Sequence, residues 1–232
     1  MREQLARSYL RPLFWDRQEA GERLAERLET YRGTDALVLG IPRGGVPVAA
    51  EVAQRIEAEL DIVVARKVGA PGAPELALGA VTANGGLFLN EDVLSSFQLD
   101  GTYLNTVVAN EQAEARRREG QLRGLRPRAP IEGRVVIVVD DGMATGATMR
   151  AAVRSARKAL PARIIVAVPV GSRESCEEMR GDADELVCLH QPEPFIAVGL
   201  YYGRFDPTED AEVRQLLREA YARRPEPEKQ AR

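Results

Sequence analysis

Side chains that often carry chemistry are scarce in this chain. It has one histidine, His190, and two cysteines, Cys176 and Cys188, in segments predicted as a helix and a strand. The cysteines lack the close spacing of a metal site, so we expect reduced thiols in or near the core. A lone histidine beside a strand is more often structural than catalytic. We therefore assign no catalytic role to His190.

Long apolar runs and an excess of positive charge are also lacking. No apolar stretch approaches the roughly 18 to 20 residues that span a bilayer, and the opening MREQLARSYL lacks the apolar stretch of a signal peptide. The 32 basic residues are outnumbered by 35 acidic ones, so the chain has no global attraction to nucleic acid or anionic lipid. We therefore expect a cytoplasmic protein without nucleic-acid or membrane partners, in which local sites hold any anionic ligand.

The apolar pattern predicts one α/β domain over residues 1–222, with helices on both faces of a mostly parallel sheet. Hydrophobic residues make up 44% of the 232, enough for one substantial core. Two strand–loop–helix–strand units are predicted. The first runs over 36–41, 46–58 and 61–66, and the second over 134–139, 149–160 and 164–170. Further helices are expected at 18–30, 102–122, 173–179 and 210–222, and a strand at 185–189. The tail 223–232 has almost nothing to bury and is expected to be disordered.

Two segments are predicted to form a small β-arm with a lid. Residues 67–79, KVGAPGAPELALG, hold three glycines and two prolines without hydrophobic periodicity, which predicts an unusually long loop. Loops of that length are often lids. Short strands near 80–82 and 87–90 flank Asn84-Gly85-Gly86, which is a typical hairpin turn.

The segment VVIVVDDGMATGATM, residues 135–149, carries the strongest chemical signal. Its apolar strand leads into Asp140 and Asp141 at the carboxyl edge of the sheet, where open α/β folds bind ligands. Carboxylates there can accept hydrogen bonds from paired sugar hydroxyls. Residues 142–148 then turn into a helix, whose unpaired N–H groups can bind phosphate together with Thr145 and Thr148. A ribose 5-phosphate fits both halves, whereas the nucleotide P-loop pattern is absent.

This segment resembles the motif with which type I phosphoribosyltransferases bind 5-phosphoribosyl-1-pyrophosphate (PRPP). The resemblance implies the type I phosphoribosyltransferase fold, a homodimer, and transfer of the phosphoribosyl group to a nitrogenous base with release of pyrophosphate. It also implies Mg²⁺, held mainly through ribose and pyrophosphate oxygens and partly by the two acids. The PRPP contacts implied within the motif are Asp140, Asp141, Ala144, Thr145, Gly146, Ala147 and Thr148.

The turn Pro42-Arg43-Gly44-Gly45 extends this resemblance. It is similar to the pyrophosphate loop of xanthine-guanine phosphoribosyltransferases. Glycines let backbone amides approach a diphosphate closely, and Arg43 can supply charge. The resemblance thus adds Arg43, Gly44 and Gly45 to the PRPP contacts.

Arg66 and Lys67, followed by the predicted loop with Glu75, resemble the pyrophosphate-contacting pair and mobile lid of adenine-type members. A closing loop has a clear purpose, because water would trap the oxocarbenium-like transition state. The resemblance therefore assigns Arg66, Lys67 and Glu75 to catalysis, with the lid over 67–79. In total it covers roughly residues 14–206.

A hood over about residues 190–206 is expected to select the base. The run from Phe195 to Tyr202 looks like the hood of hypoxanthine-guanine enzymes, which implies that Phe195 stacks on a purine with Ile196 beside it. The alternative is that Phe195 packs in a small satellite core.

Two departures count against a hypoxanthine-guanine enzyme. Many 6-oxopurine enzymes have an acid at the position of Ala144, and they place a lysine over the base where this chain has Gly171-Ser172-Arg173. The Ala-Thr-Gly order is instead similar to adenine phosphoribosyltransferases.

The function expected is a Mg²⁺-dependent phosphoribosyltransferase acting on PRPP and a base, with a purine favoured. One alternative is a non-catalytic PRPP sensor that binds nucleic acid through six arginines, at positions 116, 117, 118, 123, 126 and 128. The chain has no spare segment for a helix-turn-helix domain, and these arginines are interpreted as a solvated helix face and linker. Another alternative is a ribosyl-phosphate hydrolase, in which pyrophosphate release requires no added base.

Overall fold

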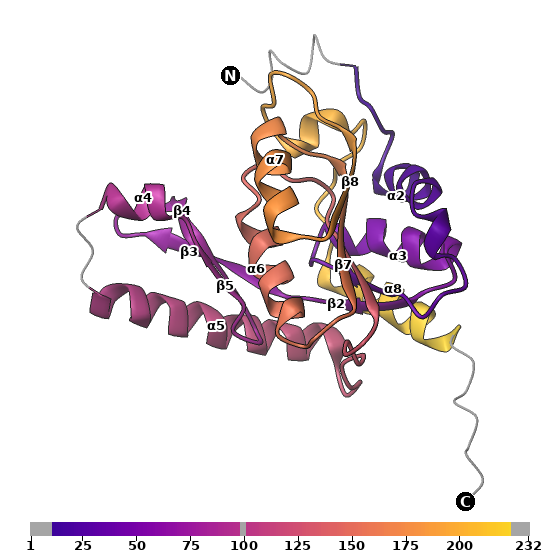
Figure 1. Ribbon diagram of the computed structural model, residues 1–232, viewed down its shortest axis with the longest axis horizontal. Helices are drawn as coiled ribbons and strands as arrows, with labels where there is room; N and C mark the ends of the chain where they lie inside the picture. Colours follow the sequence, from indigo (N-terminus) through magenta and orange to yellow (C-terminus); the bar gives the residue numbers. More distant parts are fainter. Residues whose placement is uncertain (1–10, 98–100, 224–232) are drawn as a thin grey trace, which may run out of the picture.

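Five parallel strands form the central sheet in the order β2-β1-β6-β7-β8 (Figure 1). The computed structural model describes residues 11–97 and 101–223, with the side chains of Pro74 and Glu75 outside the description. Most of the predicted disordered tail therefore lies outside the described residues. The strands of this sheet are β1 (Leu37–Gly40), β2 (Glu59–Ile62), β6 (Val135–Val139), β7 (Arg163–Val170) and β8 (Glu185–His190).

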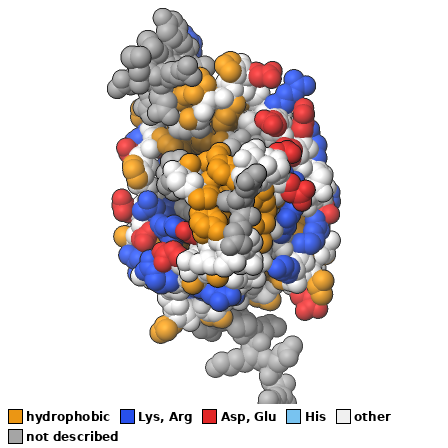
Figure 2. Space-filling view, turned by 90° about the vertical axis from the view of Figure 1, so that its left-hand side faces the viewer, with side chains coloured by type: hydrophobic (Ala, Val, Ile, Leu, Met, Phe, Trp, Pro, Cys, Tyr) orange, Lys and Arg blue, Asp and Glu red, His pale blue; other side chains and the backbone are white. Residues whose placement is uncertain are grey.

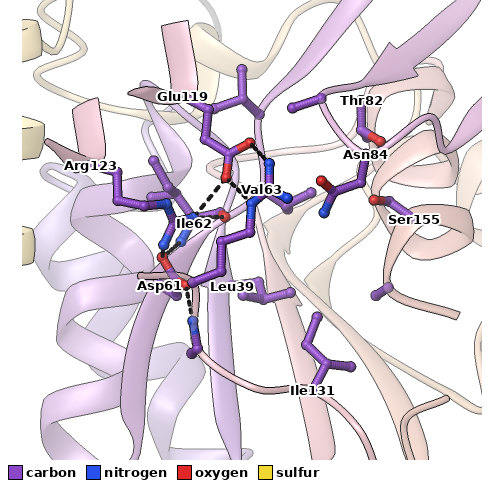
Figure 3. A pocket seen from close by; sticks show the side chains of 15 residues that line it. Leu39, Asp61, Ile62, Val63, Thr82, Asn84, Glu119, Arg123, Ile131 and Ser155 are labelled. Carbon is purple, nitrogen blue, oxygen red and sulfur yellow. Dashed lines mark hydrogen bonds and ion pairs between the residues drawn. The ribbon is translucent and has the colours of Figure 1, made fainter. Parts of the chain in front are cut away.

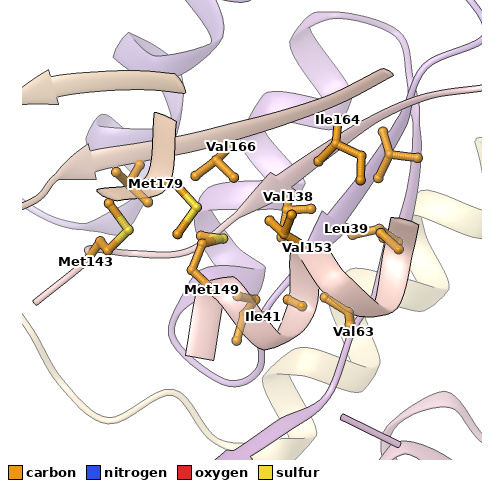
Figure 4. Packing of buried hydrophobic residues seen from close by; sticks show 14 of the residues in the cluster. Leu39, Ile41, Val63, Val138, Met143, Met149, Val153, Ile164, Val166 and Met179 are labelled. Atoms are coloured by element: carbon orange, nitrogen blue, oxygen red, sulfur yellow. The ribbon is translucent and has the colours of Figure 1, made fainter. Parts of the chain in front are cut away.

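Helices cover both faces of this sheet, as the apolar pattern predicts. Side chains alternate along β6, so Val136 and Val138 face one layer and Ile137 and Val139 the other. The first layer contains α6 (Ala147–Arg157) and α7 (Arg173–Asp182), and Figure 4 shows its packed core. The second contains α2 (Arg17–Glu26), the short helix η1 (Glu29–Tyr31) and α3 (Gly45–Arg55). Burial on both faces explains why β6 is a continuous apolar run.

A second, antiparallel sheet forms an arm that projects from the body (Figure 1). Its strands are β3 (Ala65–Ala70), β4 (Ala73–Thr82) and β5 (Leu87–Leu89), followed by α4 (Glu91–Ser95) and the long α5 (Gly101–Arg123). The predicted turn at Asn84-Gly85-Gly86 is confirmed, with Gly85 at a φ of 76°. Figure 2 views the molecule from the side of the arm, whose apolar cluster joins β3 and β4 to α5.

The predicted loop over 67–79 is wrong, because most of it is the hairpin of β3 and β4. Small residues hide its alternation: Val68, Ala70 and Leu78 are buried in the arm. Gly79 also has a packing reason, since an added Cβ there would lie 2.0 Å from the carbonyl oxygen of Phe88 on β5. A high glycine and proline content therefore did not indicate an irregular segment here.

The predicted strand over 61–66 is also wrong in its bounds. Backbone pairing with β1 continues only to Val63, whose N–H donates to the carbonyl of Gly40 at 3.1 Å. The carbonyl of Val64 then accepts from Ala83 in the arm. Arg66 and Lys67 consequently lie near the start of β3 rather than at the end of β2.

The interpretation of the arginine run as a solvated face is wrong for Arg123. This side chain is buried and pairs with Asp61 on β2 and, at 2.9 Å, with Glu119 one turn earlier on α5 (Figure 3). Arg128 donates to both oxygens of Glu119 at 2.7 Å, and the group lines a cavity of about 40 Å³. Buried charges need such partners, so this network joins the end of α5 to the edge of the sheet.

The last two elements of the described chain, η2 (Val198–Tyr201) and α8 (Asp210–Ala222), complete the central body. The short helix η2 lies in the hood, and α8 packs with α5 against the side of β2. The N–H groups of Leu13 and Phe14 donate to the carbonyl of Tyr201 at 2.9 and 3.1 Å, which ties the N-terminal segment to the hood. Within residues 11–97 and 101–223, no helix has the length and apolar character needed to cross a membrane.

Candidate active site

Asp140 and Asp141 follow β6 at the carboxyl edge of the parallel sheet. The Asp141 N–H donates to Oδ1 of Asp140 at 2.9 Å, and Nε of Arg17 donates to Oδ2 of Asp141 at 2.8 Å. Burial, followed by the negative charge of Asp141, raises the pKa of Asp140 well above its usual value. Burial also raises the pKa of Asp141, while the charge of Arg17 opposes that rise. The two carboxyl groups thus form a tightly held pair that ligand donors would stabilise.

Arg17 belongs to this site, although the sequence analysis did not select it. It is the first residue of α2, and its side chain is only 12% exposed. Its guanidinium lies 3.9 Å from the centre of the Phe205 ring, and Nη1 donates to the carbonyl of Asp206 at 2.8 Å. A cation at a helix N-terminus interacts unfavourably with the helix dipole. This unusual placement was the sequence feature that could have indicated a role for Arg17.

The turn from Pro42 to Gly45 packs directly against the two acids. An added Cβ at Gly44 would lie 2.0 Å from Oδ2 of Asp141, and one at Gly45 would lie 2.8 Å from the Cα atom of Asp140. The peptide bond between Pro42 and Arg43 is cis. Both positions therefore require glycine, because a side chain at Gly44 or Gly45 would overlap the acidic pair.

The loop between Asp141 and α6 is held in place by hydrogen bonds from the segment that follows β7. Gly146 is the N-cap of α6 and has a φ of 70°. Because α6 begins at Ala147, the unpaired N–H groups of its first turn face this loop. The carbonyl of Ala144 accepts from both Ser172 and Ser175, each at 2.7 Å. Thr145 is exposed and Thr148 is half-buried. The structure thus brings together the predicted phosphate contacts of the motif at one helix start.

A basic cavity of about 500 Å³ lies beside these elements. It brings the predicted Arg43, Arg66 and Lys67 together, and Arg66 pairs with Glu111 at 2.9 Å. Glu75, the third predicted catalytic residue, belongs to β4, and its side chain lies outside the described residues. The lining residues of the cavity are Pro42, Arg43, Val64, Ala65, Arg66, Lys67, Gly69, Glu111 and Arg118.

The hood contacts the motif through two side chains that the sequence analysis did not assign. The hydroxyl of Tyr202 donates to the carbonyl of Asp141 at 2.6 Å, and Val198 lies so close to Gly142 that an added Cβ would meet it at 2.5 Å. Phe195 packs against Tyr201 with ring centres 5.4 Å apart, whereas Ile196 is 46% exposed. The structure therefore shows a packing role for Phe195, and its stacking on a base remains a prediction.

The acidic pair offers carboxylate oxygens of the kind that Mg²⁺ takes as ligands. Among the described residues, no three acidic, histidine or cysteine side chains gather as a metal cluster. Mg²⁺ commonly takes one or two carboxylates and completes its shell with substrate phosphates and water. Asp140 and Asp141 are such donors next to a basic cavity, and Oδ2 of Asp141 is already engaged by Arg17.

Comparisons with known proteins bear on the family and the fold of this chain. The sequence profile of the family described as "Phosphoribosyl transferase domain" matches residues 17–202. The Mycobacterium tuberculosis protein Rv0571c, named as a provisional phosphoribosyl transferase, is 44% identical over 209 residues, which cover 90% of this chain and 47% of that protein. The chain thus spans about half the length of this curated relative. The crystal structure of the Thermus thermophilus protein TT1426 is 46% identical with a TM-score of 0.76, covering 89% of this chain and 98% of that one.

Proposed function

The chain belongs to the phosphoribosyl transferase family, and we propose that it transfers the 5-phosphoribosyl group of PRPP to a nitrogenous base and releases pyrophosphate. One observation carries this proposal: the acidic pair, the start of α6 and the basic cavity meet at the same edge of the sheet. These are the groups that a sugar, its 5-phosphate and a diphosphate require.

In this reaction, a base nitrogen forms a bond to C1 of the ribose while the bond from C1 to the diphosphate oxygen breaks. The electron pair of that bond leaves with pyrophosphate, whose oxygens can also take up the proton that the base nitrogen loses. Asp140 and Asp141 accept hydrogen bonds from the ribose hydroxyls, and the first turn of α6 binds the 5-phosphate with Thr145 and Thr148. This holds C1 facing the incoming base.

The basic cavity has a separate role, because negative charge grows on the departing diphosphate. Arg43, Arg66 and Lys67 line the cavity and offset that charge. We propose that Mg²⁺ is required and that Asp140 and Asp141 hold it together with substrate oxygens. When bound, the metal supplies further positive charge beside the diphosphate.

We favour a purine as the acceptor and place it under the hood, with Phe195 and Ile196 beside it. Aromatic side chains commonly stack on bases, and the partial exposure of this segment leaves it accessible. Ala144 has no ionisable group, so the proposal assigns no proton transfer to that position. We also propose a cytoplasmic homodimer, in line with the sequence resemblance.

An acceptor screen tests the proposed function. The protein is incubated with PRPP and Mg²⁺ together with adenine, guanine, hypoxanthine, xanthine, uracil or orotate, and pyrophosphate release is measured. We expect release that depends on an added base and is fastest with a purine. Release without a base would instead indicate a hydrolase, and PRPP binding without release in any mixture would indicate a sensor. The double variant D140N/D141N serves as the inactive control.

A further inference from the structure

Helix α5 contributes Arg118 to the basic cavity, although this residue belongs to the run interpreted from sequence as a solvated face. Glu111 and Arg118 both line the cavity. They are seven residues apart, which places them on the same side of a helix two turns apart. The neighbouring Arg117 is 57% exposed and pairs with Glu114 at 2.6 Å, whereas Arg118 is 27% exposed. One side of α5 therefore faces the candidate active site.

Arg118 and Arg43 share one weak counter-charge. Oδ1 of Asp210 lies 3.7 Å from Nη2 of Arg118 and 3.8 Å from Nη1 of Arg43. Both distances exceed that of a hydrogen bond, and this oxygen is buried without a hydrogen-bond partner. The carboxylate thus keeps both guanidinium groups near each other without occupying their N–H donors.

The spacing of these two arginines suits a diphosphate. Each arginine has a nitrogen atom near the same oxygen of Asp210, so the gap between these two nitrogens is no larger than the two distances together. Guanidinium groups donate paired hydrogen bonds to phosphate oxygens. The cavity lining holds four basic side chains and one carboxylate, Glu111, which pairs with Arg66, and Asp210 beside the cavity is the shared counter-charge of Arg43 and Arg118. The excess of positive charge points to an anionic ligand.

We propose that Arg118 binds the diphosphate group of the substrate together with Arg43. This inference rests on the proposed function and extends its site to α5 of the arm. Arg118 binds the leaving group and makes no contact with the ribose 5-phosphate half, which lies at Asp140 and the start of α6. The arm is then part of the active site.

The variants R118M and R117M, neighbours on one helix, test this assignment. Each is titrated calorimetrically with PRPP, inorganic pyrophosphate and ribose 5-phosphate in the presence of Mg²⁺. Loss of hydrogen bonds to a charged group predicts a Kd about tenfold or more higher for PRPP and pyrophosphate in R118M. The Kd for ribose 5-phosphate should be unchanged, and R117M should match the wild-type protein with all three ligands. R118K, which keeps the charge without the planar fork, should fall between R118M and wild type.

Several results would overturn the assignment. Equal pyrophosphate affinities of R118M and R117M would remove Arg118 from the site. An equal loss of affinity for all three ligands, with a lower melting temperature, would show that Arg118 only supports the fold. If the wild-type protein does not bind PRPP at all, the proposed function fails. PRPP binding that R118M leaves unchanged refutes this inference alone.

Discussion

The two halves of the candidate site differ in how firmly their side chains are held. In the ribose-phosphate half, Asp141 contacts Arg17 at 2.8 Å, and two serine hydroxyls hold the carbonyl of Ala144. In the diphosphate half, Arg43 has ion pairs only at 3.8 and 4.0 Å beside a cavity of about 500 Å³. The first half is preorganised, whereas Arg43 in the second half keeps its donors for a ligand. This suits a reaction in which one part of the substrate stays bound and the other leaves.

The substitution G44A should have the largest effect, because it places a methyl group against the carboxylate of Asp141. Gly44 has a φ of −60°, which alanine tolerates, but the new Cβ would lie 2.0 Å from Oδ2 of Asp141. The carboxylate must then move and lose its position against Arg17. We expect PRPP binding to fall by about a hundredfold or more, as measured by calorimetry. G181A, whose Cβ meets nothing within 4 Å, is the control, and normal PRPP binding by G44A would refute the close approach.

Removing Arg17 should weaken the preorganised half and the fold together. R17M leaves Asp141, whose side chain is only 15% exposed, without its cation, and breaking such a largely buried pair costs about 3 kcal/mol. We expect a lower melting temperature and weaker PRPP binding. The matched control is R23M on the same helix, since Arg23 also lies over an aromatic ring, that of Phe14, but is 39% exposed. If both variants behave alike, the contact with Asp141 has no special importance.

Removing Mg²⁺ should lower the affinity for ligands of the diphosphate half more than the affinity for a ligand of the ribose-phosphate half. With EDTA in place of Mg²⁺, we expect the affinity for PRPP and pyrophosphate to fall about tenfold or more, because the diphosphate then faces fewer positive charges. The affinity for ribose 5-phosphate, which depends on the first turn of α6, should change little. Calorimetry with each ligand measures both. An equal loss for all three ligands would mean that the metal organises the whole site.

The smallest expected effect is a gain in stability from D140N. The folded protein raises the pKa of Asp140, chiefly by burial, so ionisation of this carboxyl favours the unfolded chain. Near pH 7.5, D140N should therefore raise the melting temperature by a few degrees while reducing PRPP binding. The gain should disappear as the pH falls below about 4, where Asp140 is protonated in both states. A lower melting temperature at neutral pH would show that the carboxylate supports the fold.

Local sequence was enough to predict the elements that form the proposed ribose-phosphate half, apart from Arg17. The apolar run of β6, the two acids and the small residues before α6 are consecutive, so one segment of chain defines the strand, loop and helix start. The family and the parallel sheet with helices on both faces could be predicted for the same reason. The predicted bounds of helices and strands lie close to the observed ones wherever strongly hydrophobic residues repeat at one period.

The diphosphate half could be predicted only in part, because it depends on contacts between distant segments. The hairpin over 67–79 is built from alanine, glycine and valine, whose alternation is weak in the sequence. The ribose-phosphate half has one such contact, since Arg17 reaches Asp141 across 124 positions. The exposure of Arg118 is set by which side of α5 packs on the arm, and no local pattern distinguishes it from Arg117.

The tip of the β3–β4 hairpin is a suitable place to lengthen or label this protein. Gly72 has a φ of 72°, and an added Cβ there would meet no atom within 4 Å. Pro71, Gly72 and Ala73 are all exposed, and exposed loop tips are the sites that best tolerate inserted sequence. The tip lies at the end of the arm away from the central sheet (Figure 1). A fluorophore or affinity tag inserted there would report on the arm without replacing any residue of the candidate site.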